Sequence, residues 1–154
     1  QCGVRTSHED QSDVCPHIPT DGVPDLATLS SEQIALLKEP HIAQVVTLMA
    51  DGSPQISPVW VDTDGTDILI NTALGRVKTN NMERDPRVAV GVYDPVNSYS
   101  RVVNVRGHVS EISEEGADAH IDSLAKKYSG ADTYGGRNPA ETRVIIRISP
   151  DIIT

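Results

Sequence analysis

The sequence predicts a mostly β fold, a small antiparallel barrel or open sheet closed by a few short helices. Six runs of apolar and β-branched residues are separated by short segments rich in Gly, Pro and Asp, which is the pattern of strands and turns. Turns this short connect antiparallel strands, because parallel strands need a long crossover. The 154 residues suit one domain, and its core must rest on Val, Ile, Leu and Ala because the chain has no Phe and one Trp.

The first 28 residues predict a mobile N-terminal arm ahead of a domain that spans residues 29–154. The arm contains three Pro among scattered polar residues and has no apolar periodicity. A metal site is the alternative interpretation, and its candidate ligands are Cys2, His8, Cys15 and His17. These four residues lack the paired short spacings of a zinc module, so we favour an extension without a metal.

The six predicted strands share apolar, β-branched residues bounded by turns, and they cover residues 42–49, 55–61, 68–72, 87–93, 101–112 and 142–149. The first three form an antiparallel meander. A bend or bulge is expected at Gly107, inside the longest strand.

Three short helices accompany the strands. Ser30 and Gln33 form a capping box that starts a helix over residues 31–38. A second helix is expected over residues 77–84, where Asp85-Pro86 ends it. The last helix is predicted to have Ser113 as its N-cap. Its buried stripe should consist of Ala117, Ile121, Leu124 and Tyr128.

The net charge of −9 excludes several classes of function. An acidic chain is poorly suited to bind phosphate backbones without sequence preference, and five aromatic residues make no stacking platform for nucleic acid. No run approaches the roughly 20 apolar residues of a membrane span. Cys2 and Cys15 leave no cysteine in the predicted domain, and no secretory signal is evident, so a cytoplasmic location is expected.

One basic window opposes this overall charge. Residues 76–87 carry four basic and two acidic side chains. Gly75 allows the chain to turn between a strand and a helix, and Arg76 and Lys78 then stand at the helix N-terminus, where free amides also attract anions. The window can hold a phosphate, with Arg76 as a planar fork and Lys78 as a point charge. The alternative is that both side chains are solvated on an exposed turn.

The motifs of common enzymes are absent from residues 40–154: there is no nucleophile elbow, P-loop, dinucleotide fingerprint or spaced pair of metal ligands. A hydride-carrying cofactor supplies its own redox chemistry, so a protein that binds one needs none of these motifs.

The stretches GSPQISPVW (52–60), INTALGRVK (70–78) and RDPRVA (84–89) resemble the split β-barrel flavin and deazaflavin oxidoreductases, which include pyridoxamine 5′-phosphate oxidase. Within that superfamily the chain is most similar to the branch that uses coenzyme F420. The resemblance covers residues 30–154 and implies a six-stranded antiparallel split β-barrel. It also implies a homodimer with a cofactor groove at the interface, and a small-molecule substrate.

The resemblance also implies which residues bind the cofactor. Arg76 and Lys78 match positions that grip its phosphate, and Asn81 lies one turn further along. Thr72 stands at a neighbouring strand end. The residues matching the stretch that lines the tricyclic ring are Ser57, Pro58, Val59 and Trp60. For Trp60 the alternative is a core aromatic on a barrel strand.

The implied reaction transfers a hydride from reduced F420 to an unsaturated acceptor, and the proton comes from water or from a nearby Tyr or Arg. Tyr93, Tyr99 and Arg101 are the candidates for the substrate side. One alternative is an enzyme that uses FMN in the same groove. Another is a protein that binds a cofactor without catalysis, or binds haem through His41 or His108.

Overall fold

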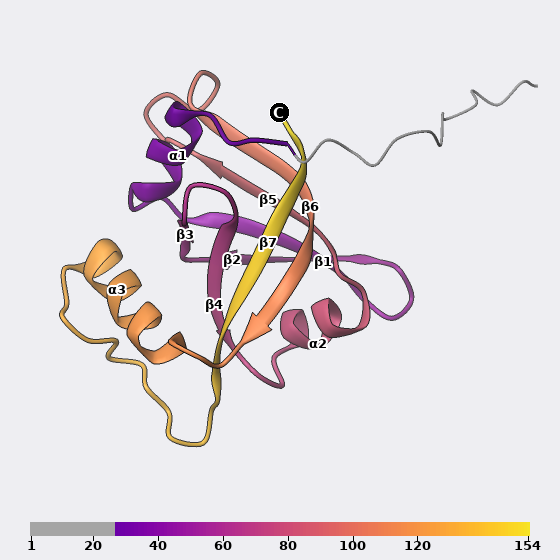
Figure 1. Cartoon of the computed structure of the whole chain (residues 1–154), viewed down its shortest axis with the longest axis vertical. Coiled ribbons are helices and arrows are strands. Elements are labelled where there is room, and N and C mark those ends of the chain that lie inside the picture. The colour runs from indigo at the N-terminus through magenta and orange to yellow at the C-terminus, as the bar shows by residue number, and fades with distance from the viewer. Residues whose placement is uncertain (1–26) are drawn as a thin grey trace, which may run out of the picture.

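The computed structural model describes residues 27–154, which form one seven-stranded antiparallel sheet and three short helices (Figure 1). The strands are β1 (Ala43–Leu48), β2 (Pro54–Val59), β3 (Val61–Thr63), β4 (Ile68–Ala73), β5 (Arg87–Tyr93), β6 (Val102–Ser113) and β7 (Arg143–Ile153). The helices are α1 (Ser31–Lys38), α2 (Val77–Arg84) and α3 (Ala117–Ser129). The predicted arm and its four candidate metal ligands lie outside the described residues, except for residues 27 and 28.

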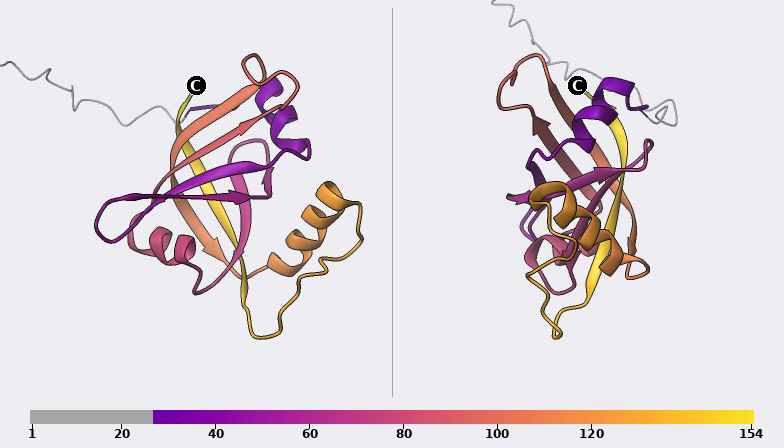
Figure 2. Two further views of the ribbon diagram at one scale, coloured as in Figure 1. Left: turned by 180° about the vertical axis from the view of Figure 1, so that it is seen from behind. Right: turned by 90° about the vertical axis from the view of Figure 1, so that its left-hand side faces the viewer.

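The order of strands makes the sheet curl into a barrel. The order is β2-β1-β5-β6-β7-β4-β3, so the two edge strands are neighbours along the chain. Only Trp60 separates them, and the sheet must therefore bend until its opposite edges approach each other (Figure 2). The mostly β, antiparallel class is confirmed.

Two details of the predicted sheet are wrong at Trp60. This residue divides the predicted strand 55–61 into β2 and β3, which gives seven strands where six were expected. The predicted meander also breaks there, because β2 pairs with β1 while β3 pairs with β4 at the other edge. Chain connectivity alone cannot reveal such a change of edge, since each flanking pair keeps an ordinary short turn.

The core lies inside the curl and consists of Val, Ile, Leu and Ala with one Met. Alternate residues of the strands point inward, as in β4, where Ile68 and Ile70 are fully buried. Helix α1 adds Leu36 and Leu37 to this core. Its predicted capping box is confirmed, because the Gln33 amide donates to Ser30 Oγ and the Ser30 amide donates to Gln33 Oε1.

Helix α3 begins later than predicted. Its N-cap is Gly116, whose φ of +73° is a left-handed conformation that glycine adopts without strain. Ser113 belongs to β6 and accepts a hydrogen bond from the Glu115 amide instead of capping the helix. The predicted stripe is confirmed at Ala117, Ile121 and Leu124, which are buried, whereas Tyr128 is half-buried.

The predicted irregularity at Gly107 is confirmed, because the register between β6 and β7 shifts between Arg106 and Gly107. A Cβ atom at Gly107 would lie 2.3 Å from the Ser149 carbonyl oxygen, so only glycine fits. Among residues 27–154, no helix is both long enough and apolar enough to cross a bilayer.

Candidate functional site

A cavity of about 350 Å³ opens beside the seam where β2 passes into β3. This volume lies within the range of small-molecule and cofactor sites. It is lined by residues of the seam, of β4, α2, α3 and β7, and of the segments before β1, α2 and β7: Ile42, Pro58, Val59, Trp60, Asn71, Thr72, Arg76, Lys78, Ile121, Tyr134 and Arg143. The structure thus brings together six of the eight predicted cofactor residues.

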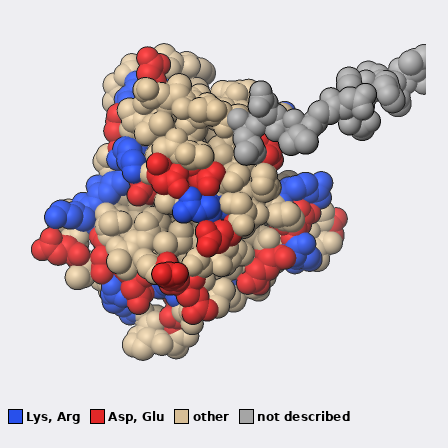
Figure 3. All heavy atoms as spheres, viewed as in Figure 1, with Lys and Arg blue, Asp and Glu red and all other residues tan. Residues whose placement is uncertain are grey.

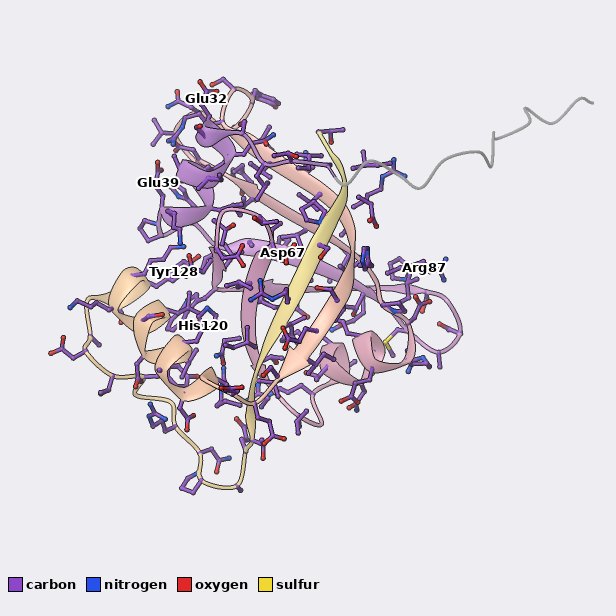
Figure 4. All side chains as sticks on the ribbon, in the orientation of Figure 1. Glu32, Glu39, Asp67, Arg87, His120 and Tyr128 are labelled. Carbon is purple, nitrogen blue, oxygen red and sulfur yellow. The ribbon has the colours of Figure 1, made fainter. Side chains whose placement is uncertain are left out.

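The aromatic end of the cavity is built around Trp60. Its ring stacks on Tyr128 with centroids 5.2 Å apart, and Tyr134 meets it edge-on at 5.9 Å. The Tyr128 hydroxyl donates to the His41 carbonyl oxygen at 2.6 Å and accepts from the Val61 amide at 3.1 Å. These bonds fix α3 against the barrel seam, where Tyr128 projects from the helix toward the sheet (Figure 4). The indole is therefore held as a rigid wall.

A second part of the cavity lining, which we call its cationic end, contains Arg76, Lys78 and Arg143. Arg76 occupies the N-cap position of α2 and makes no capping hydrogen bond, so the first-turn amides keep no side-chain partner there, and its guanidinium donates to Glu141 Oε1. Lys78 has no ion-pair partner within residues 27–154 and is half-buried. Burial and the positive charges of Arg76 and Arg143 lower the pKa of Lys78 below its usual 10.5. A bound anion would relieve this repulsion.

Arg143 joins this cationic end through strand pairing. The register of β4 with β7 places Arg143 opposite Ala73, three residues before Arg76. Asn71 fixes the guanidinium, because its Oδ1 accepts from Arg143 Nε at 2.9 Å while its Nδ2 donates to the Ala117 carbonyl oxygen at 2.8 Å. Arg143 also lies 5.4 Å from the centroid of the Tyr134 ring, which links the cationic and aromatic ends.

The cavity does not include Ser57 or Asn81. Both belong to a chain of hydrogen bonds beneath α2, in which Asn81 Nδ2 donates to Thr47 Oγ1 at 3.0 Å, the Thr47 hydroxyl donates to Gln55 Oε1 at 3.2 Å, and Gln55 Nε2 donates to Ser57 Oγ at 3.1 Å. Asn81 is 2% exposed. Within this single chain the two residues anchor α2 to β1 and β2.

The three residues predicted for the substrate side lie elsewhere. Tyr93 and Tyr99 are exposed on and beyond the end of β5, and the Arg101 guanidinium is bound between the carboxylates of Glu39 and Asp94. None of the three lines the cavity of this single chain, so their assignment to the substrate side stays a prediction.

Sequence reasoning missed five of the lining residues, namely Ile42, Asn71, Ile121, Tyr134 and Arg143. Tyr134 follows α3 in a Gly-rich loop, and Arg143 stands at the start of the last strand. An aromatic in a glycine-rich loop and an isolated arginine at a strand end are signals for a site, but only the β4–β7 register directs them to the Arg76 segment.

The cavity differs from the general surface in its charge. On the face shown in Figure 3, basic and acidic side chains lie next to one another. At the cavity, Arg76 and Arg143 share one carboxylate, that of Glu141, and Lys78 has no ion-pair partner among the described residues. A curled antiparallel barrel with an aromatic wall and a cluster of cations defines a split-barrel protein whose site suits a flat, anionic cofactor.

Comparison with known proteins identifies the family. The sequence model of pyridoxamine 5′-phosphate oxidase matches residues 29–154, so the chain belongs to this family, within the split-barrel superfamily of flavin and deazaflavin oxidoreductases. A solved F420 reductase is 32% identical, and the match covers 78% of this chain and 94% of that one with a TM-score of 0.68. No curated protein sequence matches.

Two further solved structures share the fold. A conserved hypothetical protein from Mycobacterium tuberculosis is 25% identical with a TM-score of 0.63, and the match covers 87% of this chain and 88% of that one. HupZ from Group A Streptococcus is 24% identical with a TM-score of 0.56, and the match covers 81% and 91%. At this identity HupZ supports the fold alone.

Proposed function

We propose that this protein is an oxidoreductase that binds reduced coenzyme F420 and transfers a hydride to an unsaturated small-molecule acceptor. The observation that carries the proposal is the single cavity that joins the aromatic wall at Trp60 to the cations Arg76, Lys78 and Arg143. A cofactor with a planar ring and a phosphate needs an aromatic wall for the ring and cations for the phosphate within one cavity. The similarity to an F420 reductase favours the deazaflavin over other ring systems.

The residues present fit such a group. Arg76 and Lys78 would hold the phosphate together with the amides of the first turn of α2. Pro58, Val59 and Trp60 would line the tricyclic ring. The lowered pKa of Lys78 supports this assignment, because an anion is the partner that its crowded environment lacks.

The chain's own task is to bind, orient and exclude water, since the bound deazaflavin supplies the hydride. After hydride addition the acceptor carbon skeleton requires a proton. Tyr134 and Arg143 line the cavity, where Arg143 would hold a donor water and the Tyr134 hydroxyl would hold such a water or give a proton. Because Asn71 fixes Arg143 and Trp60 meets Tyr134 edge-on, both groups are already oriented before a substrate binds.

FMN is the second candidate cofactor, and the match to the pyridoxamine 5′-phosphate oxidase family favours it. The same cations and wall would serve its phosphate and ring. A phosphorylated pyridoxine substrate would need a second group of cations, and Arg101 and Arg137 are already paired with carboxylates. We therefore rank FMN below F420.

Haem binding has little support. His41 Nε2 contacts Glu39 Oε2 at 2.9 Å, and His108 Nδ1 contacts Asp151 Oδ1 at 2.9 Å. Neither histidine lines the cavity, so neither is placed to serve there as an axial ligand.

The protein is further proposed to act as a homodimer. Val46, Leu48 and Ile152 share the outer face of β1, β5, β6 and the end of β7, which also carries two hollows of about 320 and 360 Å³. Ile56 and Ile152 on this side are 63% and 43% exposed. An apolar face of this kind suits a second copy of the chain. Sedimentation of the wild type and of Ile152→Asp would test it, with the variant expected to shift toward monomer.

The function is tested by adding F420 and FMN separately to the purified chain. Trp60 is the only Trp, so its fluorescence reports occupation of the cavity directly. We expect quenching by F420 and oxidation of reduced F420 in the presence of an unsaturated acceptor. Tighter binding of FMN would favour the second candidate, and binding of neither would overturn the proposal. Mass spectrometry of any small molecule retained through purification identifies the cofactor independently.

A further inference from the structure

The carboxylate of Glu141 lies at the cationic end of the cavity without lining it. Its Oε1 accepts from Arg76 Nη2 at 2.7 Å, and its Oε2 lies 3.9 Å from Arg143 Nη1. The guanidinium that should grip a phosphate is therefore already paired with an anion of the protein itself. An anionic ligand must share or replace this contact.

The backbone keeps Glu141 in that position. The Leu74 amide donates to the Thr142 carbonyl oxygen at 2.9 Å, which ties the residue after Glu141 to the turn that precedes Arg76. The Glu141 amide also donates to the Asn138 carbonyl oxygen at 2.9 Å. With 27% of its side chain exposed, the carboxylate is confined beside Arg76 and cannot be carried far away when a ligand enters.

We infer that Glu141 is a positioning residue that competes with the cofactor's anionic group for Arg76 and so weakens cofactor binding. This inference rests on the proposed function, because it assigns the regulated ligand to the same cavity. Three cations with no internal anion would hold a multiply charged cofactor tightly and release it slowly. One fixed carboxylate lowers that affinity and favours exchange of the used cofactor for a fresh one.

The test compares Glu141→Gln with Glu111→Gln. Both changes remove one negative charge, but Glu111 pairs with Arg147 in the middle of β7, and neither of these residues lines the cavity. We expect Glu141→Gln to lower the dissociation constant for F420 about two- to fivefold, the range of a partly exposed ion pair, while Glu111→Gln leaves it unchanged. Glu141→Asp, which keeps the charge, should restore the wild-type value. Equal or weaker binding by Glu141→Gln would overturn the inference.

A double-variant cycle shows whether the effect passes through Arg76. In the Arg76→Ala background, Glu141→Gln should no longer tighten binding. An equal gain in both backgrounds would contradict the positioning role.

Inorganic pyrophosphate separates this inference from the proposed function. Its binding is followed through the arginine side-chain nitrogen signals by NMR. If neither F420 nor FMN binds the wild type, the proposed function fails, and the pyrophosphate titration still decides the role of Glu141. A dissociation constant for pyrophosphate that is two- to fivefold lower in Glu141→Gln than in the wild type supports competition, and this is the range expected for F420 as well. Identical constants overturn it.

Discussion

Two clusters of arginine and carboxylate in this molecule have opposite balances of charge. Arg101 lies between two carboxylates, with Glu39 at 2.6 Å and Asp94 at 2.5 Å, and His41 contacts Glu39 as well. At the cavity the ratio is reversed, because Arg76 and Arg143 share the single carboxylate of Glu141 and Lys78 has no ion-pair partner among the described residues. The first cluster is electrostatically balanced by the protein, whereas the second keeps an excess of positive charge.

The pKa directions follow the same division. The hydrogen bond from Arg101 lowers the pKa of Glu39, and Glu39 and Asp94 in turn raise the pKa of Arg101. Burial instead lowers the pKa of both Lys78 and Arg143. Glu39, His41 and Asp94 also bring ligand atoms within 4.8 Å of one another, but Arg101 already occupies both carboxylates. Arg101 is thus paired within the protein, whereas Lys78 and Arg143 are crowded cations that line the cavity.

The largest expected effect is on cofactor binding by the cavity cations. Arg76→Ala and Lys78→Ala should each weaken F420 binding about 10- to 100-fold, because each removes a charge-assisted contact to the phosphate. Lys126→Ala, on the exposed side of α3, is the matched control. Titration by Trp60 fluorescence measures the change. Unchanged F420 binding in both cavity variants would show that the cavity cations do not bind the phosphate, and the two clusters would then not differ in function.

A change at Arg101 should lower stability and leave F420 binding unchanged, the reverse of a change at Arg76 or Lys78. Arg101→Met leaves two neighbouring carboxylates without their shared cation, so the temperature of unfolding should fall. F420 affinity should stay within about twofold, since distant sites act independently. Calorimetry and the same fluorescence titration measure the two quantities. The triple variant Arg101→Met, Glu39→Gln, Asp94→Asn removes the repulsion and should regain part of the lost stability.

A smaller effect is expected at alkaline pH. Lys78 must be protonated to hold an anion, and its folded pKa lies below 10.5, so F420 affinity should decline at a lower pH than an ordinary lysine would allow. For the free protein, the unfolded chain binds more protons between the folded pKa and 10.5, so this group adds stability as pH rises through that window. In Lys78→Arg the decline in affinity should disappear below pH 10.5, because arginine stays charged.

The smallest effect is expected in acid. The folded pKa values of Glu39 and Asp94 lie below the usual 4.5 and 3.8, so their stabilising contribution is present above those values and is lost as pH falls through the folded ones. The difference in stability between wild type and Arg101→Met should therefore shrink below about pH 4. Urea titrations across this pH range measure the free energy of unfolding of both proteins. A difference that stays constant down to pH 2 would contradict the pairing of Arg101 with Glu39 and Asp94.

Much of the fold could be predicted from local patterns. The capping box at Ser30 and the strand Arg87–Tyr93 depend on short-range chemistry and were predicted with correct bounds. The N-cap of α3 was misplaced because Ser113 has a capping side chain, whereas the turn at Gly116 depends on a backbone conformation. At the site, Arg76 and Lys78 could be predicted because two basic residues follow Gly75 in an acidic chain. Asn71 and Arg143 did not, since their roles arise from strand pairing across 72 residues.

The sequence by itself determined an antiparallel β domain with a basic turn beside a short helix, because alternation, turns and caps act over a few residues. Only the tertiary structure decided that the sheet edges meet at Trp60 and that Arg143 and Glu141 join Arg76. It also decided that Arg101 is already neutralised. The physical reason is that the availability of a charge depends on its neighbours in space, and these come from distant parts of the chain.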